Sequence, residues 1–321
     1  MANFVCRPAT LEDAELASDL VTASYPELPE DPKVKQYVWA HPGKGLRTVR
    51  FIAEVDGTPV ALLVWTHAPW EDVSARNAYV GVYLDQARLG SDLLVSLWEW
   101  LTGAALADGA RVLEAQVVED EAEMIEALQR IGFERDRTER VWELDLAKHG
   151  PRLVAEARDA RAKAQTESVA MTTLAEWDNP DSLRKLHALA ELTRRDIPTS
   201  YPIPPQPFED FVERMNVPDR RRDRVWIATA GGAPVALSFL RFPPVRGQVW
   251  TGYTCTHPDY RGRGLARGIK LQTLAQAAEL GIPAVLTDND SENAPMLHIN
   301  ETLGYDGRLG FISFVKRVKS N

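Results

Sequence analysis

Cysteine, positive charge and long apolar runs are all scarce in this sequence. Its 321 residues include two cysteines, Cys6 and Cys255, which lie far apart, so a disulfide framework is not expected and a reducing cytoplasm fits. The formal net charge is -9, which makes nucleic acid a poor partner. No apolar run approaches the roughly 18 residues of a membrane helix, and residues 1–30 lack the apolar core of a signal peptide. These absences predict a cytoplasmic protein without a membrane or nucleic-acid partner.

Hydrophobic residues make up 45% of the chain, which is ample for packed cores, and the length suggests about two domains. Strand-like and helix-like segments alternate, which predicts an α/β fold. In the first half, strands are expected at Phe4–Arg7, in a hairpin within Phe51–Trp65, and at Asn77–Leu84, Arg111–Val117 and Val141–Leu146, with helices at Leu11–Ser24, Asp31–Ala40, Ser91–Asp108 and Glu121–Ile131. The Ala/Arg-rich segment Lys148–Gln165 has no wide apolar stripe and is interpreted as a helical linker.

The pattern then restarts, which indicates an internal repeat. The hexapeptide Gly57–Leu62 reappears as Gly232–Leu237, an offset of 232 − 57 = 175. Four residues recur at an offset of 172, namely Gly90, Gly109, Met124 and Gly132, which match Gly262, Gly281, Met296 and Gly304. A three-residue length change in one loop reconciles the two offsets. Chance would give some matches among 20 glycines, but these matches together favour a duplication.

The most informative stretch is Thr254–Lys270. The preceding residues, Trp250–Thr256, are aromatic and β-branched and predict a strand, whereas a helix is expected from Leu265. Gly262 and Gly264 lie between them and permit backbone angles closed to other residues. Such a loop offers unpaired N–H groups and the positive end of a helix dipole to an anion, best a phosphate. The alternatives are a structural turn or an Arg-Gly RNA-binding segment, and the acidic net charge disfavours the latter.

This stretch resembles motif A of the GNAT superfamily, the general N-acetyltransferases that use acetyl-CoA. The family signature, Arg/Gln-x-x-Gly-x-Gly/Ala, is matched by Arg261, Gly264 and Ala266. The resemblance implies a pyrophosphate-binding loop, and a strand bulge that frees N–H groups near Cys255 and Thr256 as an oxyanion hole. The cofactor-binding residues expected on this basis are Thr254, Cys255, Thr256, Arg261, Gly262, Arg263, Gly264, Leu265 and Ala266.

The first copy departs from this signature. At offset 172 it has Leu89 for Arg261, Asp92 for Gly264 and Leu94 for Ala266. Asp92 would put a carboxylate where the pyrophosphate should lie, and like charges repel at short range. A shift of one residue would align Arg88 with Arg261 but would not restore the glycines. The first copy is therefore interpreted as a degenerate GNAT-like domain that has lost the cofactor.

A second cluster, Thr287–Tyr305, resembles motif B of the same family: a strand, an Asn, a helix, then Leu-Gly-aromatic before the last strand. The resemblance implies that Asn293 contacts the pantetheine arm. Many family members carry a tyrosine seven residues later as general acid for the leaving thiolate, but here that position is Asn300. Asn300 can donate a hydrogen bond to the sulfur but cannot protonate it. Tyr305 is the other candidate acid, although it falls at the family's structural aromatic, where core packing is favoured.

The acidic residues of this cluster alternate as in a calcium loop. Asn293 and Ile299, however, stand where such a loop needs glycine and glutamate, so no metal is expected. The general base stays open, because residues 248–256 contain no acid. The candidates are His257, His298, Asp288 or water.

The acyl acceptor is expected over residues 182–215, where a proline-rich loop separates two predicted helices, Leu183–Thr193 and Pro207–Met215. Long loops on a rigid scaffold are often functional. Asp196 and Tyr201 could meet an amine there. A helix cap and a packed ring are the equally open structural roles for these two residues.

The sequence thus predicts two tandem GNAT-like domains, each a twisted mixed β-sheet flanked by helices. The expected boundaries are 1–147 for the degenerate domain, 148–166 for the linker and 167–321 for the cofactor-binding domain. The resemblance implies direct transfer of an acetyl group from acetyl-CoA, or another acyl-CoA, to an amine or peptide acceptor, in a monomer or homodimer. The alternative is a non-catalytic CoA-binding sensor.

Overall fold

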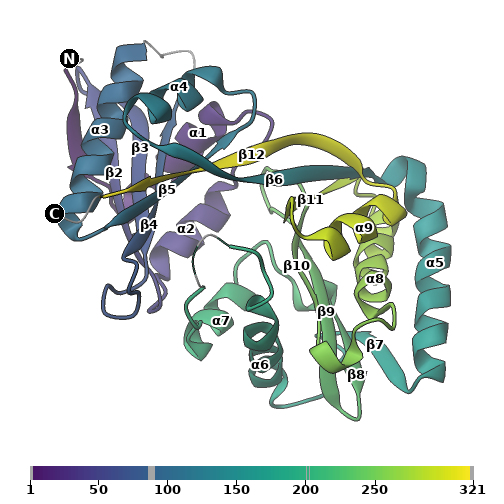
Figure 1. Cartoon of the computed structure of the whole chain (residues 1–321). Coiled ribbons are helices and arrows are strands. Elements are labelled where there is room, and N and C mark those ends of the chain that lie inside the picture. The colour runs from purple at the N-terminus through teal and green to yellow at the C-terminus, as the bar shows by residue number, and fades with distance from the viewer. Residues whose placement is uncertain (1–2, 86–90, 200, 202, 319–321) are drawn as a thin grey trace.

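The computed structural model describes residues 3–85, 91–199, 201 and 203–318, in which helices and strands form the expected mixed α/β fold (Figure 1). The first half contains β1 (Val5–Pro8), α1 (Ala14–Ser24), α2 (Pro32–Ala40), β2 (Arg47–Val55), β3 (Thr58–His67), β4 (Asn77–Leu84), α3 (Ser91–Asp108), β5 (Val112–Val118), α4 (Ala122–Arg130) and β6 (Glu134–Asp145). None of the helices in these described ranges has the length and apolarity to cross a bilayer.

Helix α5 (Leu146–Thr166) leads into the second half. That half contains β7 (Val169–Thr173), α6 (Ser182–Arg194), α7 (Phe208–Met215), β8 (Val225–Ala230), β9 (Ala233–Arg241), β10 (Trp250–Thr256), α8 (Leu265–Glu279), β11 (Ala284–Asp290), α9 (Ala294–Leu303) and β12 (Asp306–Arg317). The predicted bounds of β4, α3 and β10 are confirmed, whereas β6 begins seven residues earlier than the predicted strand Val141–Leu146.

Local chemistry accounts for several of these boundaries. The Asp31 carboxylate accepts the backbone N–H groups of Lys33 and Val34 at 2.8 and 3.1 Å and so caps α2. Asp56 and Gly57 have positive φ angles of 50° and 73°, which fits the predicted tight turn between β2 and β3.

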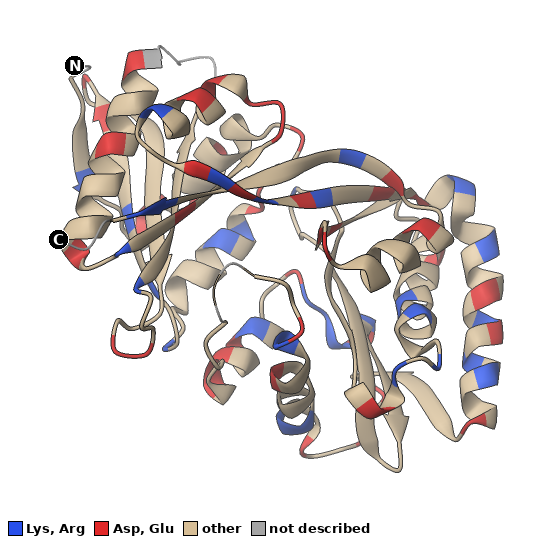
Figure 2. Ribbon diagram, viewed as in Figure 1, with Lys and Arg blue, Asp and Glu red and all other residues tan. Residues whose placement is uncertain are grey.

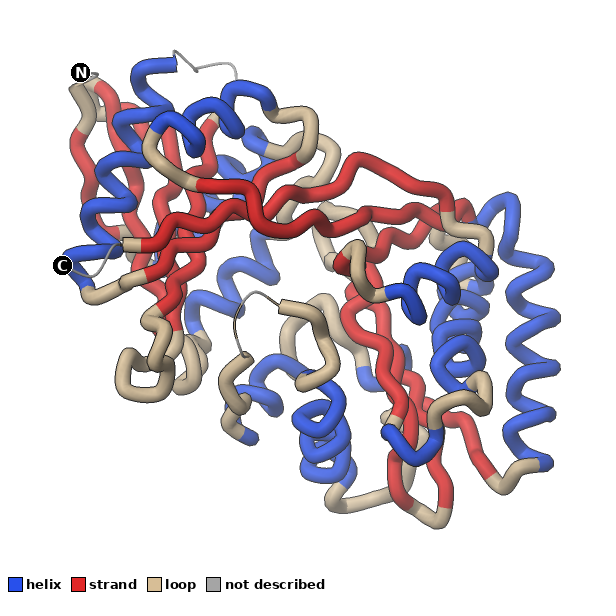
Figure 3. The backbone as a smooth tube through the Cα atoms, viewed as in Figure 1, coloured by secondary structure: helices blue, strands red, loops and turns tan. Residues whose placement is uncertain are grey.

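A continuous sheet runs through both halves in the order β1-β2-β3-β4-β5-β12-β6-β11-β10-β9-β8-β7. Each strand of the first half has a counterpart six strands later, β1 with β7, β2 with β8 and so on to β6 with β12. Swapping every strand with its counterpart gives the same order read backwards, so the two halves are related by an approximate two-fold axis. This symmetry confirms the predicted duplication. The last strands are exchanged between the halves, because β12 pairs with β5 and β6 pairs with β11. Figure 3 shows these two long strands bridging the molecule. The sheet therefore crosses the predicted domain boundaries, which stay a prediction.

Helices cover both faces of the sheet in each half. In the first half, α3 and α4 pack on one face around Leu97 and Leu128, and α1 packs on the other around Leu20. In the second half, α8 and α5 share a core with β11, and α6 and α7 cover the opposite face. Helix α5 is more than a linker, because it buries Leu153 and Ala157 against the core of the second half. Charged residues of both signs recur along its length (Figure 2).

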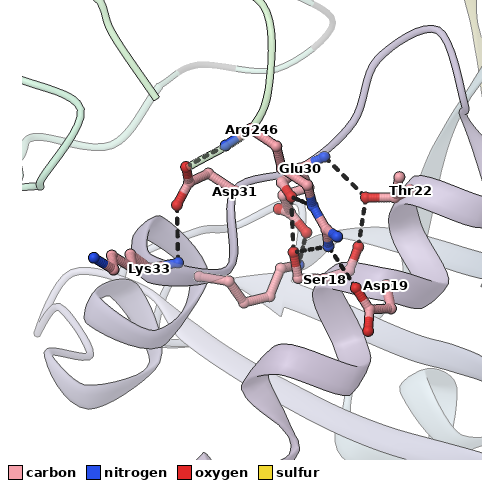
Figure 4. A network of polar contacts seen from close by, with 8 residues as sticks. Ser18, Asp19, Thr22, Glu30, Asp31, Lys33 and Arg246 are labelled. Atoms are coloured by element: carbon pink, nitrogen blue, oxygen red, sulfur yellow. Dashed lines mark hydrogen bonds and ion pairs between the residues drawn. The ribbon is translucent and has the colours of Figure 1, made fainter. Parts of the chain in front are cut away.

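The β9–β10 loop of the second half is fastened to the first half by a polar network (Figure 4). Arg246 donates to the Glu30 carbonyl at 2.7 Å, to Ser18 Oγ at 2.9 Å and to Asp19 Oδ1 at 2.6 Å. Asp31, besides capping α2, accepts the backbone N–H groups of residues 245 and 246 at 2.6 and 3.1 Å. These contacts hold the entry to β10 in a fixed place beside the first half.

A second contact fixes α7. The buried carboxylate of Asp210 accepts the backbone N–H groups of Lys44 and Gly45 at 2.8 and 2.7 Å. A Cβ at Gly43 would lie 2.8 Å from Asp210 Oδ2, so this loop needs glycine for close approach. The helices expected to carry the acceptor site are thus anchored to both halves.

Candidate functional site

Strands β10 and β11 diverge at the centre of the second half. They run parallel, but the register joins them only at Trp250 and Leu286. Against β9, the pairing of β10 shifts between Thr251 and Tyr253, so Gly252 is the extra residue of a bulge. A Cβ on Gly252 would lie 2.1 Å from the Phe239 ring, which explains the glycine. The bulge lies three residues before Cys255, whereas the sequence placed its effect near Cys255 and Thr256.

The divergence leaves backbone donors facing a gap. The His257 N–H donates to the Val235 carbonyl on β9 at 2.8 Å. Because N–H directions alternate along an antiparallel pair, Cys255 also faces β9, and Thr254 and Thr256 direct their N–H groups toward the β11 side. The Thr256 hydroxyl is buried there without a hydrogen-bond partner among the described residues. The oxyanion role expected of Cys255 and Thr256 stays a prediction.

The loop after β10 has the backbone of an anion site. Gly262 and Gly264 have φ angles of 74° and 78°, and Gly264 is the N-cap of α8. Apart from the adjoining residues of the chain, no atom lies within 4 Å of the position of a Cβ on either glycine, so the space at both positions is open. Leu265 begins the helix as a buried residue, and the N–H groups of the first turn have no partner within the helix.

Arginines surround this loop, but each has a protein partner. Arg261 forms an exposed ion pair with Asp196 at 2.5 Å. Arg263 stacks on the Tyr260 ring at 4.8 Å, and Arg267 pairs with Glu156 of α5 at 2.6 Å. The structure therefore brings the predicted cofactor loop together with Asp196 of the predicted acceptor loop.

A cavity of about 470 Å³ adjoins the loop, between the start of α8 and α5. Arg263, Gly264 and Arg267 line one side, and Glu156 and Lys163 line the other. Burial acts to raise the pKa of Glu156, but hydrogen bonds from Arg267 and Arg152 outweigh it and lower the pKa. The α5 side of this cavity lies 96 or more residues from the loop in sequence (263 − 167), so its part in the site could not be read from the motif.

Asn300 is fully buried in a polar triad. Its Oδ1 accepts from Lys270 Nζ at 2.7 Å, and its Nδ2 donates to Asn289 Oδ1 at 2.7 Å. Lys270 is also fully buried, and its ammonium lies 4.8 Å from the centre of the Tyr305 ring. Burial lowers the pKa of Lys270 to about 7, against the opposing attraction of Asp288. Sequence reasoning missed Lys270 and Asn289, although a lysine within the mostly buried stretch 268–275 was a signal.

Tyr305 packs beside this triad, and Asn293 caps the helix that carries Asn300. Tyr305 is 4% exposed and belongs to the hydrophobic core of the second half. Burial raises the pKa of Tyr305, with a smaller opposing effect from the Thr251 hydroxyl. Asn293 is the N-cap of α9, and its Oδ1 accepts the Met296 N–H at 3.4 Å. The catalytic and pantetheine roles expected of Tyr305, Asn300 and Asn293 stay predictions.

Among the remaining candidates, Asp288 precedes the triad residue Asn289 on β11. His257 Nδ1 accepts the Asp259 N–H at 3.3 Å and caps the short turn before the glycine loop. His298 and Asp288 are exposed. Tyr201 is half-buried in the acceptor loop, and its hydroxyl has no hydrogen-bond partner in the described part of the chain. No described group of three His, Cys, Asp or Glu side chains could hold a metal ion.

The first half also has a pair of diverging parallel strands, but the loop that follows lacks a counterpart of Gly264. Strands β4 and β5 pair only from Asn77 to Tyr79 on β4 and then separate. Asp92 is exposed in the first turn of α3, at the position that corresponds to Gly264. The compared positions Arg88, Leu89 and Gly90 lie outside the described residues.

The geometry defines a class of protein: a duplicated α/β chain in which one pair of diverging strands leads to a loop suited to an anion. Residues 186–305 match the model of the acetyltransferase (GNAT) family. A tandem GNAT protein from the clavulanic acid biosynthesis pathway is 18% identical, with a TM-score of 0.76 over 99% of this chain and 100% of that one. A GCN5-related N-acetyltransferase from Sphaerobacter thermophilus is 16% identical, with a TM-score of 0.69 over 99% and 96%.

A GNAT-family acetyltransferase from Colwellia psychrerythraea is 13% identical, with a TM-score of 0.61 over 98% of this chain and 100% of that one. No curated protein gives a significant sequence match. Residues 186–305 thus match the GNAT family model, and the whole chain has the fold of the tandem GNAT structure.

Proposed function

We propose that the second half is an acyl-CoA-dependent N-acyltransferase that transfers an acetyl group directly to an amine. The observation that carries this proposal is the diverging pair β10 and β11, which leads straight into an open glycine loop at the N-terminus of α8. An extended thioester substrate fits between separated strands, and its diphosphate fits the loop.

Binding of the diphosphate and polarisation of the thioester both have candidate groups in this chain. The N–H groups of residues 262–266 would hold the diphosphate, with Arg261 and Arg263 adding positive charge. The N–H groups of Thr254 and Thr256 would fix the pantetheine arm and polarise the thioester carbonyl. Attack by the neutral amine would give a tetrahedral intermediate, which loses the amine proton to water and collapses with loss of the thiolate. Asn293 is proposed to contact the pantetheine arm.

A second function, a non-catalytic CoA-binding sensor, is favoured by one specific observation. Both candidates for assisting the leaving thiolate are sealed in the core, since Asn300 is 0% and Tyr305 is 4% exposed. A sensor needs the loop and the strand gap but no acid. Incubation of the protein with acetyl-CoA and a library of amines distinguishes the two, because only the enzyme releases free CoA thiol in proportion to an added amine.

The binding site is tested by calorimetry with CoA on two matched variants. Gly264→Asp puts into the loop the carboxylate that the first half carries as Asp92, and CoA binding should be lost. Gly281→Asp is the control, because Gly281 has a similar φ of 76°, equally open space at Cβ, and a place at the far end of α8. Loss of binding in both variants, or in neither, would contradict the assignment.

A further inference from the structure

The diverging strands of the first half enclose a cavity of about 910 Å³, larger than the cavity beside the glycine loop. Its floor is apolar and buried: Leu84 at the end of β4, Leu94 on α3 and Met124 on α4 are each under 8% exposed. Val141 and Leu286 close it from the β6 and β11 side. A chamber of this size and lining suits the apolar body of a small molecule.

The rim of this cavity is acidic. The described lining residues include four carboxylates, Glu27, Asp120, Glu121 and Glu123, and a single cation, Arg308. Arg308 is itself paired with Glu143 at 3.1 Å, so it does not offset the rim charge. Three of the carboxylates, Glu27, Asp120 and Glu123, are exposed to solvent above the apolar floor. Carboxylates around an apolar cavity attract cationic ligands and repel anions.

An aromatic ring completes the lining. Tyr25 follows the last residue of α1 and is half-buried at the cavity wall. Its ring packs edge-on against Tyr83, with centroids 6.2 Å apart. Glu121 interacts with the Tyr25 hydroxyl, and together with burial this raises the pKa of Tyr25. An aromatic face beside carboxylates is the usual surrounding of an ammonium group in proteins.

We propose that this cavity binds an organic ammonium compound, with its apolar body on the leucine and methionine floor and its charged head at the acidic rim. The same rim excludes CoA, whose phosphates carry the opposite charge. The cavity also reaches the second half, because Leu286 forms the register pair with Trp250 at the point where β10 and β11 diverge. A ligand here therefore contacts both halves next to the closed end of the second cleft.

Calorimetry of the whole protein with n-octylamine, without any acyl-CoA, tests this site independently of the proposed transferase activity. One octylamine per chain should bind at neutral pH, whereas octanoate of the same chain length should not bind. Glu123→Gln should weaken octylamine binding about fivefold, the scale of an exposed ion pair. Glu126→Gln is the matched control, because Glu126 is exposed on the same helix but does not line the cavity.

A second variant separates the cavity from general attraction to an acidic protein. Ala122 is exposed at the start of α4 and lines the cavity, so Ala122→Arg should place a cation at the rim and abolish octylamine binding. The proposal is overturned if octylamine fails to saturate one site, if octanoate binds as tightly, or if Glu126→Gln weakens binding as much as Glu123→Gln. Undiminished binding by a folded Ala122→Arg protein would overturn it as well.

Discussion

The two halves place opposite chemistry at matching positions beneath their diverging strands. In the second half, Lys270, Asn289 and Asn300 form the buried polar triad next to Tyr305. Subtracting the repeat offset of 172 gives Trp98, Val117, Leu128 and Phe133 in the first half, and all of these are buried. There Trp98 packs edge-on against Phe133 with centroids 6.1 Å apart, much as the Lys270 ammonium lies against the Tyr305 ring.

This comparison teaches that the fold does not require the polar triad. The helix packs on the sheet through apolar side chains at these positions in the first half, and through a buried lysine and its polar partners in the second half. A buried ion or polar group is costly to desolvate, and apolar replacements are often as stable or more stable. The triad occurs in the half that has the open glycine loop, which points to a role in function rather than in folding.

The largest expected difference between the halves is cofactor stoichiometry. Titration with CoA should give one site per chain, because Asp92 carries charge where Gly264 leaves open space. Calorimetry at several protein concentrations measures this number directly. Two equivalent sites would show that Asp92 does not exclude the cofactor, and the contrast between the halves would fail.

The triad can be broken one residue at a time or converted as a whole. Asn300→Leu should lower the free energy of unfolding by about 3 kcal/mol, since it leaves Lys270 buried without its acceptor. The triple change Lys270→Met, Asn289→Val and Asn300→Leu should recover most of that loss, because it recreates the apolar solution of the first half. Urea denaturation measures both values. A triple variant as unstable as the single one would show that the two halves are not interchangeable.

Stability should also depend on pH through Lys270. Its pKa is about 7 in the folded protein and 10.5 ordinarily, so the unfolded chain binds more protons between these values. The free energy of unfolding should therefore rise as pH increases from about 7 toward 10, relative to Lys270→Met, which lacks this group. Lys33→Met, at an exposed position of α2, is the control and should keep the wild-type slope. Equal slopes for wild type and Lys270→Met would contradict the assignment.

The smallest expected effect concerns the ion pair between the cofactor loop and the acceptor loop. Asp196→Asn frees Arg261 for the diphosphate and should strengthen CoA binding by no more than about fivefold, because the pair is exposed. Asp259→Asn removes the same charge near the loop without releasing an arginine side chain, so it separates this effect from general electrostatics. Equal strengthening by both variants would show that the specific pair is unimportant.

Local sequence patterns were sufficient to define much of this protein. Aromatic and β-branched residues predicted the bounds of β10, and the two glycines before Leu265 located the left-handed turn at the start of α8. The repeat offset predicted the duplication, and Asp92 predicted that the two copies differ at the loop. These features depend on residues within a few positions of one another or on direct comparison of two segments.

Only the tertiary structure decided how the halves are joined and what lies between them. The exchange of β6 and β12 depends on pairing between strands that are far apart in the sequence, which the local pattern of neither strand specifies. The contacts of Asn300 with Lys270, and of Arg246 with Ser18, span 30 and 228 positions in the chain. Their directions depend on packing, which fixes where a buried donor finds its acceptor. The sequence determined that both halves have the same arrangement of strands and helices. The packing determined that the cavity of the first half is lined with carboxylates and that the diverging strands of the second half lead to the N–H groups of the glycine loop.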